Sequence, residues 1–132
     1  MNRNLHIGDV EIGLPAVQAA LSGYSDLPMR TVARELGATY ALNEVVLDTL
    51  VLQKGKLQRR ILSVPEHEHP VGGQLMGSRP ETFGLAAREM VRAGYDIVDI
   101  NFGCPVNKVL GRHRGGWLLQ DVETALAVVG AV

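Results

Sequence analysis

The sequence has little of what marks secreted, membrane-spanning or nucleic-acid-coating proteins. Cys104 is the only cysteine among 132 residues, which rules out an internal disulfide framework. No stretch is apolar and long enough to span a bilayer, and residues 1–6 lack the apolar run of a secretory signal. The net charge of -1 gives no overall basic field for nonspecific nucleic-acid binding. We therefore expect a cytoplasmic protein without a membrane partner, in which any RNA contact is local.

What is present favours one globular α/β unit. Hydrophobic residues make up 46% of the chain and charged residues 20%, which is enough apolar material for a core. A pattern of helix, glycine, apolar strand and polar residues at the strand end occurs at least twice in the sequence. The pattern predicts strands at residues 16–21, 40–42, 71–76 and 97–100. Residues 47–69 depart from this alternation of helices and strands. We expect them to form a long connecting segment with one short helix.

Helix starts are marked by residues that commonly cap helices. Ser25 is expected to cap a helix over residues 27–36, and Ser78 with Glu81 forms a capping-box pattern before a helix that begins near Pro80. A further helix is expected around residues 122–129. Strands that alternate with helices imply parallel strands joined by right-handed crossovers.

Four strand-helix units amount to half of an eight-unit barrel. A full barrel of this type typically needs about 250 residues. The expected fold is therefore α/β, a partial TIM-type (β/α) barrel of about four units with parallel strands, and an open doubly wound sheet is the alternative. A half-barrel leaves two sheet edges unpaired, so we expect copies to associate as a homo-oligomer or additional sequence to close it.

Cys104 follows the strand expected at residues 97–100. The carboxyl ends of parallel strands are where α/β enzymes place their chemistry. A lone cysteine without further context is more often a small buried apolar residue, so the surrounding residues decide between the two interpretations.

Those surroundings carry a family resemblance. Residues 19–30, residues 43–44, residues 74–78 and the Asn-Phe-Gly-Cys-Pro block within residues 99–105, with Lys108 close behind, resemble the tRNA-dihydrouridine synthase family. The resemblance runs from about Pro15 to the end of the chain. It implies that residues 1–132 are the amino-terminal half of a flavin-binding barrel, apparently truncated, without the family's carboxyl-terminal RNA-binding domain.

The resemblance implies a reaction and its cofactors. The family reduces the C5=C6 bond of uridine in tRNA with flavin mononucleotide (FMN), which is itself reduced by a nicotinamide cofactor, usually NADPH. Hydride passes from the flavin to C6 and a cysteine protonates C5; by position Cys104 is that acid. No glycine-rich dinucleotide motif follows the first expected strand, so NADPH would meet the flavin transiently.

The resemblance also assigns binding residues. The flavin-binding positions are Ala20, Leu21, Ser22, Gln74 and Asn101, where Ala20 and Leu21 replace the proline and methionine that the family usually carries. Glu44 matches an acidic residue of the family and would contact the substrate. Independently of the resemblance, Lys108, Arg112 and Arg114 lie on a glycine-containing basic loop suited to tRNA phosphate contacts, with an ordinary solvated loop as the alternative. The family is usually less basic in this segment.

Arg30 is interpreted as structural, and His67 with His69 lacks a third spaced ligand, so no metal site is expected. Because the family's flavin-phosphate loops are not found in these residues, the isolated chain is expected to bind flavin poorly. The alternatives are a catalytically silent fragment that acts through oligomerisation or RNA interaction, and a different flavin barrel of the dihydroorotate dehydrogenase type.

Overall fold

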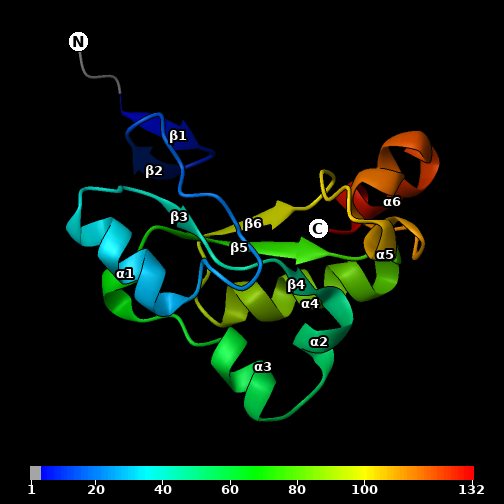
Figure 1. Cartoon of the computed structure of the whole chain (residues 1–132), viewed down its shortest axis with the longest axis horizontal. Helices are drawn as coiled ribbons and strands as arrows, with labels where there is room; N and C mark the ends of the chain where they lie inside the picture. The colour runs from blue at the N-terminus through cyan, green and yellow to red at the C-terminus, as the bar shows by residue number, and fades with distance from the viewer. Residues whose placement is uncertain (1–3) are drawn as a thin grey trace.

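A computed structural model describes residues 4–132 of the chain (Figure 1). Its elements in chain order are β1 Leu5–Ile7, β2 Val10–Gly13, α1 Leu27–Glu35, β3 Ala41–Leu42, β4 Val46–Leu47, α2 Asp48–Leu52, α3 Lys56–Ile61, the 3-10 helix η1 Glu66–Glu68, β5 Val71–Met76, α4 Pro80–Arg92, β6 Ile97–Ile100, α5 Asn107–Leu110, the 3-10 helix η2 Gly115–Gln120 and α6 Val122–Ala131.

The main sheet is parallel and follows the order of the chain. β3 and β4 pair with successive stretches of one edge of β5, and β6 pairs with the other edge. On the outer side of β3, Gln18 forms a single parallel bridge with Ala41. Consecutive strands therefore lie side by side without the reversal of order that defines a doubly wound sheet. The prediction of an α/β partial barrel with parallel strands is confirmed.

The predicted first strand at residues 16–21 is wrong in extent. Only Gln18 pairs, through its N–H to the Tyr40 carbonyl at 3.2 Å and its carbonyl to the Leu42 N–H at 3.0 Å. In residues 4–132 this segment has a neighbour on one side alone, and its alanines have low strand propensity. Both features leave it extended and correctly placed beside β3 but barely paired.

Two predicted helix caps are also wrong. Asp26, not Ser25, caps α1 by accepting a hydrogen bond from the Met29 N–H at 3.1 Å. The Ser25 hydroxyl instead bonds to the N–H and carbonyl of Leu21 within the preceding turn. At α4 the N-cap is Arg79, and no side chain caps the helix, so the Ser78 capping box does not form.

Two adjacent glycines in β5 show what lies on each face of the sheet. A Cβ on Gly73 would lie 2.1 Å from the Met90 Cε of α4, which places the helices on that face. A Cβ on Gly72 would lie 2.2 Å from the Tyr40 hydroxyl, on the opposite face. Both positions therefore require glycine because a large side chain from elsewhere already occupies the space.

Each face has its own apolar cluster. Phe83, Met90 and Leu75 are among the fully buried residues between the sheet and the helices α2 and α4. On the other face the β1–β2 hairpin places Ile12 against Tyr40 and Leu42, near the amino-terminal ends of the strands. Figure 1 shows the hairpin at one end of this face and α5 with α6 toward the other, with no helix over its middle in the part of the chain described.

The last helix covers α4. The Gly84 Cβ position would lie 2.5 Å from the Ala131 carbonyl of α6, so the two helices approach closely there.

Across residues 4–132 we find no helix with both the length and the apolar character needed to cross a membrane.

Candidate functional site

Cys104 lies in the loop between β6 and α5, and its backbone is held from two directions. Its N–H donates to the Asn101 Oδ1 at 3.1 Å, and its carbonyl accepts from the Gly116 N–H at 3.0 Å. The residue is half-buried. The loop that carries the thiol is thus tied both to the end of β6 and to η2.

Gly115 brings the segment that follows α5 tightly against the cysteine. Its φ is +58°, in the left-handed region that favours glycine, and a Cβ there would lie 2.9 Å from the Cys104 Cβ. Only glycine satisfies both the backbone conformation and the contact. This explains physically why a glycine-containing loop follows the cysteine.

Gln74 lies near the carboxyl end of β5, and its backbone is held by an unusual partner. Between β3 and β4 the strand ladder is interrupted, and the buried Asn43 side chain replaces it by accepting the Gln74 N–H at 2.7 Å. The Asn43 Nδ2 in turn donates to the Tyr95 hydroxyl at 3.1 Å. Burial raises the pKa of Tyr95, so its hydroxyl stays protonated and donates to the Ile61 carbonyl at 2.8 Å.

The Gln74 side chain joins two neighbours on β6 and just after it. Its Nε2 donates to the Asp99 Oδ2 at 2.7 Å, and its Oε1 accepts from the Asn101 Nδ2 at 2.8 Å. Because Asn101 also holds the Cys104 N–H, the side chains of Asp99, Gln74 and Asn101 form one continuous chain of hydrogen bonds to the cysteine loop.

This chain leaves hydrogen-bonding capacity free. A primary amide has two donor hydrogens and two acceptor lone pairs, and Gln74 uses one of each. Gln74 and its partners Asp99 and Asn101 are half-buried rather than enclosed. The site can therefore offer an adjacent donor and acceptor to a planar ligand edge that carries the complementary pair.

Sequence reasoning missed Asp99 and Asn43 as members of this site. For Asp99 a signal existed: residues 97, 99 and 101 alternate along β6 and therefore share a face with Gln74 of the paired strand. For Asn43 no local signal existed, because its role depends on the gap that β3 and β4 leave beside β5.

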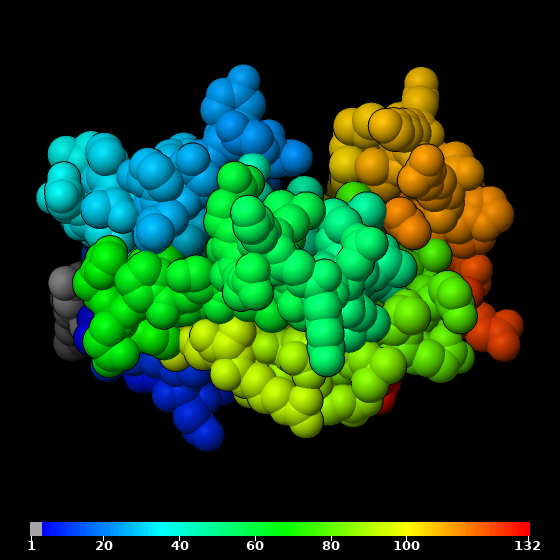
Figure 2. All heavy atoms as spheres, turned by 90° about the horizontal axis from the view of Figure 1, so that it is seen from below, coloured from blue at the N-terminus to red at the C-terminus, as the bar shows by residue number. Residues whose placement is uncertain are grey.

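The other expected flavin positions lie apart from this chain of hydrogen bonds. Ala20 packs against the Ile12, Tyr40 and Leu42 cluster, whereas Leu21 and Ser22 are exposed in the turn before α1. In Figure 2 the surface is hollowed between the blue segment that precedes α1 and the yellow-orange segment around α5.

Glu44 is placed by the turn before α1. Its Oε1 accepts the Gly23 N–H at 2.5 Å, which ties the end of β3 to that turn. Glu44 also lines a cavity of about 580 Å³ with Arg60 and Tyr95. Neither Gln74 nor Cys104 lines that cavity. The cavity is therefore separate from the hydrogen bonds that join Asp99, Gln74 and Asn101.

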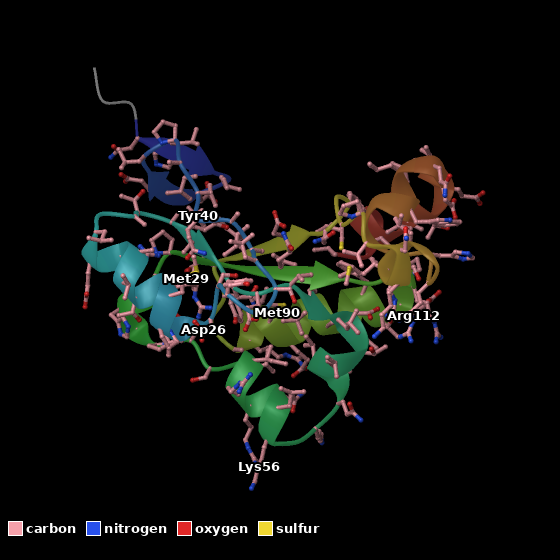
Figure 3. The ribbon with its side chains drawn as sticks, in the orientation of Figure 1. Asp26, Met29, Tyr40, Lys56, Met90 and Arg112 are labelled. Atoms are coloured by element: carbon pink, nitrogen blue, oxygen red, sulfur yellow. The ribbon has the colours of Figure 1, made fainter. Side chains whose placement is uncertain are left out.

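The basic residues after Cys104 differ in accessibility. Lys108 and Arg112 are exposed, whereas Arg114 is half-buried and its Nε is enclosed without a hydrogen-bond partner. Between them, His113 stacks on Trp117 with ring centroids 4.1 Å apart. Figure 3 shows Arg112 beside α5, at the end of the molecule opposite α1.

The histidines of residues 66–69 have a structural explanation. The His69 Nδ1 lies 2.8 Å from the Asp96 Oδ2, while His67 is exposed. Within the described range 4–132 no group of three or more His, Cys, Asp or Glu residues is placed to hold a metal ion.

The family model described as dihydrouridine synthase (Dus) matches residues 17–132. The chain belongs to the dihydrouridine synthase family. The match includes β3 to β6, Gln74 and the complete cysteine loop. The hydrogen-bonded side chains of Asp99, Gln74 and Asn101 therefore lie inside the region that defines the family.

Named members of the family align over nearly the whole chain. A probable tRNA-dihydrouridine synthase of Rickettsia prowazekii is 28% identical over 129 residues, which is 96% of this chain and 39% of the relative. tRNA-dihydrouridine synthase B of Pseudomonas aeruginosa is 30% identical and that of Pseudomonas putida 32%; each alignment covers 97% of this chain, and 39% and 38% of the respective relative. The chain thus spans about two fifths of the length of these synthases.

Proposed function

We propose that this chain forms part of an enzyme that reduces uridine in tRNA to 5,6-dihydrouridine. FMN is the proposed hydride donor, NADPH the reductant of the flavin, and Cys104 the proton donor. Membership of the dihydrouridine synthase family supports this reaction class. The observation that carries the residue assignments is the continuous chain of hydrogen bonds from Gln74 through Asn101 to Cys104.

The donor set suits the ring of a flavin. Gln74 retains a donor hydrogen and an acceptor lone pair side by side, which complement the alternating N–H and carbonyl groups of the flavin's pyrimidine edge. We also assign Asn101, and Ala20, Leu21 and Ser22 of the segment before α1, to flavin binding. When bound, FMN supplies the hydride that the C5=C6 bond receives at C6.

Cys104 completes the reduction by transferring its thiol proton to C5. Addition of a hydride at C6 and a proton at C5 saturates the bond and leaves a thiolate, which water reprotonates. The two backbone hydrogen bonds of Cys104 hold the loop that carries the thiol to Asn101 and to Gly116. This role fits a general acid and needs no covalent bond to sulfur.

The tRNA contacts are assigned to residues on two sides of the cysteine. Lys108 and Arg112 are exposed and can approach phosphates, and Arg114, half-buried on the same loop, is assigned a phosphate contact with them. Glu44, held by the Gly23 N–H, is the acidic contact on the opposite side.

We further propose that residues 1–132 form the amino-terminal half of the flavin barrel and that this half holds the flavin ring but not its phosphate. The chain spans 39% of its Rickettsia and Pseudomonas aeruginosa relatives, and the ring-binding donors described above lie on β5 and β6. Self-association to cover the open half-barrel stays a prediction. It is motivated by β6, which bonds only to β5 among the described strands. Analytical sedimentation measures the self-association directly.

Flavin binding by the chain tests the ring site. We expect FMN and riboflavin, which lacks the phosphate, to bind with affinities within about threefold of each other in a fluorescence titration. Gln74→Leu should weaken both by about tenfold, because one or two hydrogen bonds to the ring are lost. Absence of any ring binding by the chain would contradict the assignment, and much tighter binding of FMN would contradict the division of ring and phosphate.

Turnover tests the role of Cys104. NADPH, FMN and unmodified tRNA are incubated with the protein, and dihydrouridine is quantified by mass spectrometry of nucleosides. We expect low turnover from the isolated chain, and at least about 100-fold less from Cys104→Ala, since general acid catalysis typically contributes that much. Equal turnover by Cys104→Ala would assign the proton transfer to another group.

A further inference from the structure

Asp99 is the only member of the hydrogen-bonded chain that cannot donate a hydrogen bond when ionised. It lies on β6, in register with Gln74 of β5, and its Oδ2 accepts the Gln74 Nε2 hydrogen at 2.7 Å. A carboxylate offers acceptors alone, whereas each amide offers a donor end and an acceptor end that exchange places when the group turns over.

This difference fixes the direction of the hydrogen bonds from the Asp99 end, and the Gly103 and Cys104 N–H groups favour the same direction at the other end. Asp99 requires the nitrogen end of the Gln74 amide to face it, which turns the Gln74 oxygen toward Asn101. The Asn101 nitrogen then faces Gln74, and its oxygen faces the N–H groups of Gly103 and Cys104, at 3.2 and 3.1 Å. A turned-over Asn101 would place its NH2 group against two backbone donors and release the loop.

We propose that Asp99 is a positioning residue that sets the orientation of both amides and thereby holds the Cys104 loop in place. Its importance for catalysis rests on the proposed function, because that function is what gives the position of the thiol a purpose. The orientation of the two amides is a property of the polypeptide alone and is measurable without flavin or tRNA. Asp99 touches no reacting atom in this role.

The wild-type protein provides the first test. In a protein labelled with ¹⁵N and ¹³C, couplings across hydrogen bonds connect a donor nitrogen with the acceptor's carbonyl carbon. We expect such a coupling from the Asn101 side-chain nitrogen to the Gln74 side-chain carbon. A coupling in the reverse direction, from the Gln74 nitrogen to the Asn101 side-chain carbon, overturns the proposal without any mutation.

Variants of Asp99 provide the second test, read out as amide hydrogen exchange at Cys104. Asp99→Leu removes the acceptor, and we expect the Cys104 amide to exchange about tenfold faster, the effect of losing roughly one hydrogen bond. Asp99→Asn keeps an oxygen that accepts from Gln74, so exchange should stay within about threefold of wild type. Exchange as fast in Asp99→Asn as in Asp99→Leu overturns a role based on the acceptor.

A double-mutant cycle separates positioning from a general structural effect. Gln74→Leu breaks the chain next to Asp99, so Asp99→Leu should add nothing to Cys104 exchange in that background. Additive effects overturn the proposal, because they would mean that Asp99 acts on the loop by another route. The Asn101 N–H, which bonds to the Leu75 carbonyl at 2.9 Å, is the internal control: its exchange must stay unchanged if β5 and β6 remain paired.

The outcomes for this inference and for the proposed function are distinguishable. If the exchange results hold and no flavin ring binds, the orientation by Asp99 stands and the assignment of the flavin ring to these residues does not. If the ring binds and the cycle is additive, the flavin site stands and Asp99 is not its positioning residue.

Discussion

The guanidinium of Arg30 on α1 and the carboxylate of Glu68 on η1 form a buried, two-pronged ion pair. The Nε–Oε1 and Nη2–Oε2 distances are 2.6 and 2.9 Å, and the two residues are 4% and 1% exposed. Burial alone would lower the pKa of Arg30, but the hydrogen bonds and charge of Glu68 outweigh it and raise that pKa above its ordinary value. The pair joins α1 to the turn that enters β5, in agreement with the interpretation of Arg30 as structural.

Removing one partner of this pair should be costly. Arg30→Met leaves the Glu68 charge buried without its partner, and we expect the free energy of unfolding to fall by about 3–5 kcal/mol in urea titrations. The double variant Arg30→Met/Glu68→Met should recover most of the loss. Arg92→Met is the matched control, because its pair with Glu89 is on the surface and should contribute far less. A double variant as unstable as the single one would show that the pair itself, not the isolated charge, matters.

How far the sequence predicts this fold depends on whether local pattern or tertiary contact decides an element. The predicted and observed limits of β5 and β6 coincide, because proline, glycine or polar residues bound both segments. β5 is buried at all positions but Gln74, whereas β6 is half-buried throughout. The cap of α1 could not be resolved in this way. Ser25 and Asp26 are both good caps, and the choice is made by the contact of Ser25 with Leu21.

The candidate site shows the same division. The family resemblance singled out Gln74, Asn101 and Cys104, and the structure brings all three together. Asn43 is part of the motif at residues 43–44, but its function as a substitute for the strand ladder exists only once β5 lies beside it. Asp99 acquires its partner only through the register of β5 and β6.

The raised pKa of Tyr40 leads us to expect a loss of folding stability at alkaline pH. Burial, with the added charges of Asp99 and Asp96, raises the pKa of Tyr40 to about 12 from the ordinary value of 10.0. The folded state therefore favours the neutral phenol, and this contribution is complete below pH 10 and disappears as the pH rises toward 12. At pH 11 we expect a loss of about 1.4 kcal/mol from this residue.

Chemical unfolding at pH 8 and pH 11 measures the Tyr40 contribution. Tyr40→Phe should lower the pH dependence by that amount; burial also raises the pKa of Tyr95, so part of the dependence remains. Tyr24→Phe is the control, because this ring is 71% exposed. The same pH dependence in wild type and Tyr40→Phe would exclude Tyr40 as its source.

Two glycines with the same backbone conformation allow the contact with Cys104 to be isolated. Gly8 and Gly115 both have a φ of +58°, but a Cβ on Gly8 meets nothing within 4 Å, whereas one on Gly115 meets Cys104. Gly8→Ala should cost about 1–2 kcal/mol of stability for the left-handed backbone. Gly115→Ala should cost more and, by displacing the loop, increase the alkylation rate of the single thiol by iodoacetamide. Equal stability losses with unchanged alkylation would show that the loop accommodates the methyl group.

The exposed cations beside Cys104 predict the salt dependence of tRNA binding. If Lys108 and Arg112 contact phosphates, the double variant Lys108→Ala/Arg112→Ala should reduce the slope of log affinity against log salt concentration by roughly 2. Lys54→Ala/Lys56→Ala removes the same charge from the exposed segment at the start of α3, which Figure 3 shows well apart from Arg112. That control should leave the slope near the wild-type value. If both double variants change it equally, the attraction comes from the overall charge of the protein and not from the loop that follows the cysteine.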